Sequence, residues 1–87
     1  MMIYSAIKKL VTYGLETGLV PQEEQIYTTN LILDCLKLDD YEDDGVEYKN
    51  VELEPVLNEI LDYAVSKGTQ GDDIERIQQR LYELGYL

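Results

Sequence analysis

The sequence predicts an all-α fold, a small four-helix domain made of two helical hairpins that an acidic linker joins. Four segments have apolar residues at helical spacing, three of them are followed by glycine, and one acidic stretch without periodicity divides the chain. With 87 residues and 45% hydrophobic content, a chain of this size is a single small domain that buries roughly 60 to 65% of its unfolded surface.

A first helix is predicted over residues 2–17. Its apolar residues follow the i, i+3, i+4, i+7 spacing of an amphipathic helix. Gly18 suits the left-handed position that often ends a helix, and Leu19 can close that cap by an apolar contact. The apolar stripe consists of Ile3, Ala6, Ile7, Leu10, Val11, Gly14 and Leu15.

A second helix is predicted over residues 21–38. Pro21 fits the first turn, where its missing N–H costs nothing, and Glu23 and Glu24 complement the positive end of the helix dipole. The apolar residues cover more than one stripe, so we expect the C-terminal half of this helix to be the most buried segment. They are Ile26, Tyr27, Leu31, Ile32, Leu33, Cys35, Leu36 and Leu38.

Residues 39–50 are predicted to form a solvated acidic linker, because this stretch has no helical period and its like charges repel one another. Asp40, Glu42 and Asp44, followed by Gly45, resemble the first half of an EF-hand calcium loop. Position twelve of such a loop would be Val51, which cannot supply the bidentate carboxylate that completes the site. We therefore predict no metal site, and a calcium-binding module is a distant alternative.

A third helix is predicted over residues 53–67, with Pro55 in its first turn and Gly68 after its end. A fourth is predicted over residues 73–84, where Asp72 and Glu75 have the spacing of a capping box. Gly85 ends this helix. The apolar stripes consist of Leu53, Val56, Leu57, Ile60, Leu61 and Ala64 in the third helix, and of Ile74, Ile77, Leu81 and Leu84 in the fourth.

The first and third helices form a weak internal repeat. A shift of 50 positions lays residues 7–18 over residues 57–68, and it places Tyr27 over Ile77 and Leu31 over Leu81. Since each copy is followed by another helix, we predict two helical hairpins that bury their apolar stripes against each other.

The composition excludes several classes of function. A formal net charge of −11 repels nucleic acids and anionic lipid headgroups, so neither nucleic acid nor membrane is expected as a partner. The sequence has neither a signal-peptide pattern nor an apolar run long enough to span a bilayer, and its one cysteine, Cys35, fits a reducing compartment. We therefore expect a cytoplasmic protein in which Cys35 is a small buried hydrophobe.

The sequence offers no catalytic residue, cofactor-binding residue or metal ligand set. The chain contains no histidine, so Cys35 has no imidazole to activate it, and there is no glycine-rich phosphate loop or zinc-binding spacing. The eight tyrosines could stack on ligands, but most of those in the helices are expected to pack at the edge of the core, with their hydroxyls in water. These are Tyr4, Tyr13, Tyr27, Tyr63 and Tyr82.

Several segments, in the same order, resemble the opening of the galactose-1-phosphate (hexose-1-phosphate) uridylyltransferases of Gram-positive bacteria. The resemblance covers about residues 2–68 and does not extend to the last 16 or so residues. It rests on Ile3-Tyr4-Ser5-Ala6-Ile7, Leu10-Val11-Thr12-Tyr13-Gly14-Leu15, Ile26-Tyr27-Thr28-Thr29-Asn30, Leu38-Asp39-Asp40-Tyr41-Glu42 and Ile60-Leu61-Asp62-Tyr63-Ala64-Val65.

This resemblance implies an N-terminal accessory segment of an enzyme that transfers a uridylyl group from UDP-glucose to galactose 1-phosphate. In that family a histidine of a His-x-His element carries the group, and no residue here corresponds to it, so the chain alone is expected to be inactive. The expected partners are the catalytic domain of the same enzyme or a second subunit, with a homodimer as one form of the latter. The alternative is a free-standing acidic helical module for protein interaction or self-association.

Overall fold

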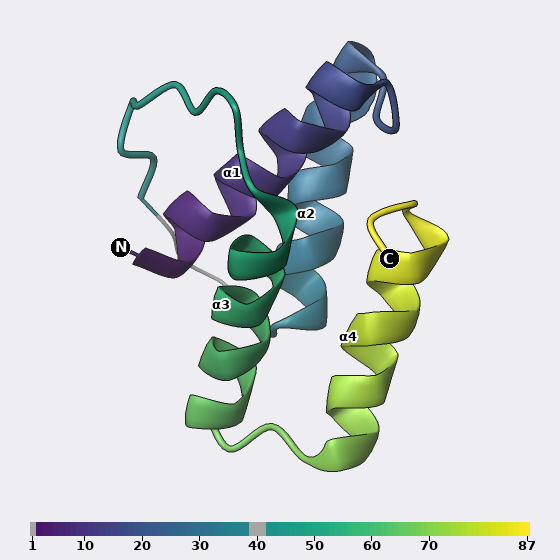
Figure 1. The fold of residues 1–87 in the computed structure, drawn as a ribbon. Helices are drawn as coiled ribbons and strands as arrows, with labels where there is room; N and C mark the ends of the chain where they lie inside the picture. Colours follow the sequence, from purple (N-terminus) through teal and green to yellow (C-terminus); the bar gives the residue numbers. More distant parts are fainter. Residues whose placement is uncertain (1, 39–41) are drawn as a thin grey trace.

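A computed structural model describes residues 2–38 and 42–87. Within these ranges the protein is all-α, with four α-helices and no strand, which confirms the predicted fold class (Figure 1). The elements are α1 (Met2–Thr17), the short 3₁₀ helix η1 (Gln22–Glu24), α2 (Gln25–Cys35), α3 (Leu53–Ser66) and α4 (Gly71–Glu83).

The centre of the fold is the packing of α1 against α3, which is the most extensive contact between two helices. The internal repeat fits this pairing, because equivalent positions are buried in both helices. The buried pairs are Ala6 and Val56, Ile7 and Leu57, Leu10 and Ile60, and Gly14 and Ala64. The helix α2 contacts both α1 and α4, so the grouping into two separate hairpins stays a prediction.

The repeat does not extend to the environments of α2 and α4. Tyr27 is 63% exposed, whereas Ile77, at the matching position, is buried. The two helices begin at Gln25 and Gly71, which is not the spacing of the repeat. The shift therefore relates only α1 and α3.

The prediction that the second half of α2 is the most buried segment is wrong, because α1 contributes far more to the core. Only Thr28, Ile32 and Leu33 are buried in α2, while Ile26 and Tyr27 near its start are exposed. This eleven-residue helix is shorter than expected and has only one side turned toward its neighbours. Of its remaining apolar side chains, Leu31 and Cys35 are half-buried.

The boundaries of α2 differ from the prediction at both ends. Pro21 has an extended conformation and precedes η1, so the α-helix begins only at Gln25. At the other end, Lys37 has a left-handed φ of 55°. The N–H of Leu38 donates to the carbonyl of Leu33 at 3.0 Å. This is the helix-ending arrangement usually built on glycine, and here it stops the helix at Cys35 instead of Leu38.

The predicted capping role of Asp72 is also wrong. The residue before α4 is Gln70, which makes no side-chain capping bond, and the helix begins at Gly71. Asp72 therefore lies inside the first turn, where its charge still favours the helix dipole but its side chain cannot cap. In contrast, Gly18 and Gly68 have the positive φ values, 78° and 79°, that the predicted helix ends require.

The core draws on all four α-helices and on the segment after α4. Of the five helical tyrosines expected at its edge, Tyr4 is buried, Tyr13 and Tyr63 are half-buried, and Tyr27 and Tyr82 are exposed, so the prediction fails for the last two. The buried apolar residues are Ile3, Tyr4, Ala6, Ile7, Leu10, Val11, Val20, Ile32, Leu33, Val56, Leu57, Ile60, Ala64, Ile77, Leu81 and Tyr86. None of the helices in the described ranges is long and apolar enough to cross a bilayer.

Candidate functional site

Polar and charged side chains gather where the described part of the acidic linker runs beside α1. We call this set the linker cluster, and it consists of Ser5, Lys8, Asp43, Asp44 and Tyr48. The hydroxyl of Ser5 donates to Asp44 at 2.6 Å, and the hydroxyl of Tyr48 donates to the same carboxylate. The ammonium group of Lys8 lies 2.7 Å from Asp43 and 3.5 Å from Asp44. The contacts of Ser5 and Lys8 join segments more than 30 positions apart in the sequence.

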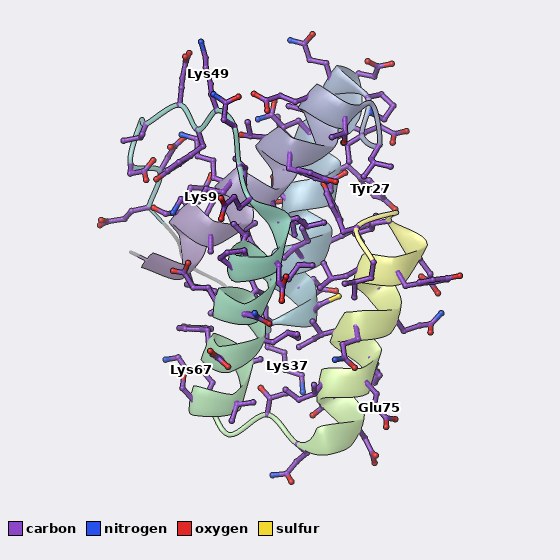
Figure 2. The ribbon with its side chains drawn as sticks, viewed as in Figure 1. Lys9, Tyr27, Lys37, Lys49, Lys67 and Glu75 are labelled. Atoms are coloured by element: carbon purple, nitrogen blue, oxygen red, sulfur yellow. The ribbon has the colours of Figure 1, made fainter. Side chains whose placement is uncertain are left out.

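Local backbone geometry explains why the two aspartates face α1. Each carboxylate accepts a hydrogen bond from a backbone N–H two residues later, Asp43 from Gly45 at 2.9 Å and Asp44 from Val46 at 3.0 Å. Such turns are typical of aspartate. The ammonium group of Lys9 lies 5.2 Å from the centre of the Tyr48 ring, a cation–π distance. Figure 2 shows Lys9 on the side of α1 that faces this segment.

Hydrogen bonds hold both carboxyl groups in their ionised form. The hydroxyls of Ser5 and Tyr48, together with the N–H of Val46, keep the pKa of Asp44 well below its usual value. The bond from Lys8 has the same effect on the pKa of Asp43, helped by the N–H of Gly45. The ionised carboxylates accept these hydrogen bonds near neutral pH, so the linker cluster anchors the linker to α1.

The stretch that resembles the first half of an EF-hand loop, the distant alternative, falls partly outside the described residues. Asp40 lies there, while Asp44 is occupied by the contacts of the linker cluster. In the described ranges no three or more His, Cys, Asp or Glu side chains are grouped so that they could hold a metal ion.

The contacts of the linker cluster with α1 should break only in acid. Lowered pKa values mean that its stabilising effect is fully present above about pH 4 and is lost as the pH falls through the folded-state values. We expect the NMR signals of Ser5 and Lys8 to shift together below about pH 4. In an Asp44→Asn variant the Ser5 signal should already be displaced at neutral pH and should lose most of its acid transition, whereas Lys8 should keep the part that comes from Asp43.

The exposed carboxylate of Asp62 on α3 provides a matched control for this titration. An Asp62→Asn variant should leave the acid transition of Ser5 and Lys8 unchanged. If it altered the transition as much as Asp44→Asn does, a general charge effect would replace the local anchor as the explanation.

A second feature is a groove of about 360 Å³ between α2 and α4, in which Cys35 lies beside Arg76 and Arg80. Figure 2 shows Lys37 reaching from the end of α2 toward α4, where its ammonium group is 4.0 Å from Asp73. Cys35 is half-buried and packs against the core, so it is less enclosed than expected. Burial raises the pKa of its thiol, and the two arginines offset this only in part, so the thiol is a poor nucleophile at neutral pH.

Together, the fold and these two features define a small acidic all-α segment whose polar side chains anchor its own structure. No family model matches the chain, and no solved structure matches it significantly. Among curated proteins it is similar to a galactose-1-phosphate uridylyltransferase of Butyrivibrio fibrisolvens, with 49% identity over 73 residues, which is 84% of this chain and 19% of the relative.

Two further relatives have the same description. The galactose-1-phosphate uridylyltransferase of Clostridium acetobutylicum is 27% identical over 73 residues, or 84% of the chain, and that of Halalkalibacterium halodurans is 40% identical over 65 residues, or 71% of the chain. The chain spans only 15% and 12% of their lengths. The resemblance to galactose-1-phosphate uridylyltransferases is thereby confirmed, and the match to a short part of each relative fits an accessory domain.

Proposed function

We propose that this chain is an N-terminal accessory segment of a galactose-1-phosphate uridylyltransferase and that it performs no catalysis itself. In the complete enzyme the uridylyl group moves from UDP-glucose to galactose 1-phosphate in the cytoplasmic metabolism of galactose. One observation carries the proposal: 84% of the chain aligns with such an enzyme while spanning 19% of it, and the aligned chain contains no histidine. A nucleotide carried on imidazole must then be carried by another part of the enzyme.

The role left for the helices is to pack against the catalytic part of the same enzyme or against a second subunit. Several large apolar side chains are exposed and suit such a contact, among them Ile26, Tyr27, Val65 and Tyr82. The net charge of −11 favours a partner surface that is basic, and it disfavours nucleic acids and membranes as partners.

A second candidate is a free-standing acidic module that binds a basic protein or associates with itself. The closed core favours it, because buried residues from all four α-helices and Tyr86 form one cluster, which lets the chain fold without a partner. Sedimentation over a range of concentrations measures self-association, and a single monomeric species at all concentrations would remove that form of the second candidate.

Segment exchange tests the accessory role. We expect the Butyrivibrio enzyme to keep its activity within about tenfold when its matching segment is replaced by the aligned residues of this chain, since a tenfold loss corresponds to only about 1.4 kcal/mol. Deletion of the segment should instead reduce the amount of folded enzyme and lower its activity by more than the exchange does. The measurements are kcat/KM for galactose 1-phosphate and the yield of folded protein.

A matched exchange provides the control. The same chimera with Ile60→Ala, which weakens the core of the segment, should lose folded yield in the same way as the deletion. If the enzyme without the segment were as stable and as active as the intact one, the accessory role would be refuted.

A further inference from the structure

Tyr86 is a buried side chain on an otherwise exposed end of the chain. It lies beyond the end of α4 and is 3% exposed, while Leu87 beside it is 51% exposed. Figure 1 shows the C-terminal turn bending back toward the connection between α1 and α2. The ring therefore ties the end of the chain to the first half of the fold.

The ring of Tyr86 fits into a notch that exists because residue 14 is a glycine. A Cβ atom added to Gly14 would lie 2.5 Å from the Tyr86 hydroxyl oxygen, 3.0 Å from its Cε1 and 2.8 Å from Cγ2 of Val20. The N–H of Val20 donates to the carbonyl of Gly14 at 3.0 Å, which fixes one wall of the notch. Any other residue at position 14 would fill the space that the ring occupies.

The hydroxyl of Tyr86 destabilises this contact. It is buried and has no hydrogen-bond partner among the described residues, and burial raises its pKa to about 12. Burial of the apolar ring stabilises its position in the notch, and burial of the hydroxyl without a hydrogen-bond partner destabilises it. Each effect is worth roughly one to two powers of ten in an equilibrium constant, so the buried position of the ring is favoured by only a small margin.

The backbone bonds of this turn do not secure the ring in the notch. The N–H of Tyr86 donates to the carbonyl of Leu81 at 2.9 Å, and the N–H of Gly85 donates to that of Tyr82 at 3.0 Å. Both bonds belong to the end of α4. The turn meets α1 and the following loop through side-chain packing, in which the Tyr86 ring lies over Gly14 and Val20 and Gly85 lies near Leu19.

From this geometry we propose that Tyr86 is a reversible latch. In the closed position its ring fills the notch at Gly14. In the open position the ring leaves, its hydroxyl is hydrated, and an apolar notch formed by Gly14 and Val20 is uncovered while the four helices stay folded. The open position is a minor state, populated on the order of 1 to 10%.

Methyl relaxation dispersion at Val20 tests the latch in the intact chain. We expect exchange on the microsecond-to-millisecond scale at Val20, where the Tyr86 ring moves in and out, and no matching exchange at Ile60 in the core. In Tyr86→Phe the buried hydroxyl is absent, so the open population should fall by about tenfold. Tyr82→Phe removes an exposed hydroxyl from the same helix and should change nothing.

A further variant identifies the open state itself. Tyr86→Ala removes the ring and leaves the notch at Gly14 uncovered, so its Val20 methyl shift should match the minor-state shift obtained from dispersion in the unaltered chain. The latch would be refuted by a flat dispersion profile at Val20, by equal exchange at Ile60, or by an open population that Tyr86→Phe leaves unchanged.

Discussion

Replacing Ile60 by alanine is expected to lower the free energy of unfolding by about 2 to 5 kcal/mol. Ile60 is 0% exposed and lies on α3, and Leu10, its counterpart in the repeat on α1, is equally buried. A domain of this size is stabilised by only about 4 to 13 kcal/mol, so the loss is a large share of the total. Urea denaturation followed by far-UV circular dichroism measures the change.

Val65 supplies the matched control on the same helix, because it is 60% exposed. Val65→Ala should change the free energy of unfolding by less than about 0.5 kcal/mol. If Ile60→Ala cost no more than this control, the contact between α1 and α3 would not be the centre of the fold.

Replacing Gly14 by alanine should destabilise the protein by about 1 to 3 kcal/mol, although alanine favours a helix interior by up to about 1 kcal/mol over glycine. The added methyl group would collide with Tyr86 and Val20, as the distances of 2.5 and 2.8 Å show. The collision expels the Tyr86 ring, and its burial is lost. Thermal and urea denaturation both report the difference.

Two comparisons separate this collision from the effect of alanine on the helix. An added Cβ at Gly71, in the first turn of α4, meets nothing within 4 Å, so Gly71→Ala should be neutral or stabilising. In a Tyr86→Ala background, Gly14→Ala should cost less, and the difference measures the coupling between the two residues. Equal costs with and without Tyr86 would show that the ring does not depend on Gly14.

The sequence predicts α1 and α3 closely because each has a long apolar stripe and a glycine within two residues of its end. It predicts α2 poorly for two physical reasons. Burial of Ile26 and Tyr27 depends on whether another element covers them, which periodicity cannot reveal. The end of α2 is set by the left-handed backbone of Lys37, a residue type that gives no such signal.

The contacts of the linker cluster lie beyond reasoning from the sequence, since Ser5 and Asp44 are 39 positions apart and each looks like an ordinary polar residue. The sequence indicates the close approach at Gly14 more clearly. A glycine inside a helical stripe often marks a place where another group approaches closely. The sequence does not reveal that this group is Tyr86, because the turn after α4 has no periodic pattern.

Uridylyl transfer by the purified chain is the most direct measurement of whether these helices do any chemistry themselves. The assay contains galactose 1-phosphate and UDP-glucose labelled in its uridylyl group. We expect the label to appear in UDP-galactose no faster than in buffer alone, because the chain has no histidine to carry the uridylyl group. Transfer that increases in proportion to the concentration of this chain would contradict a purely accessory role.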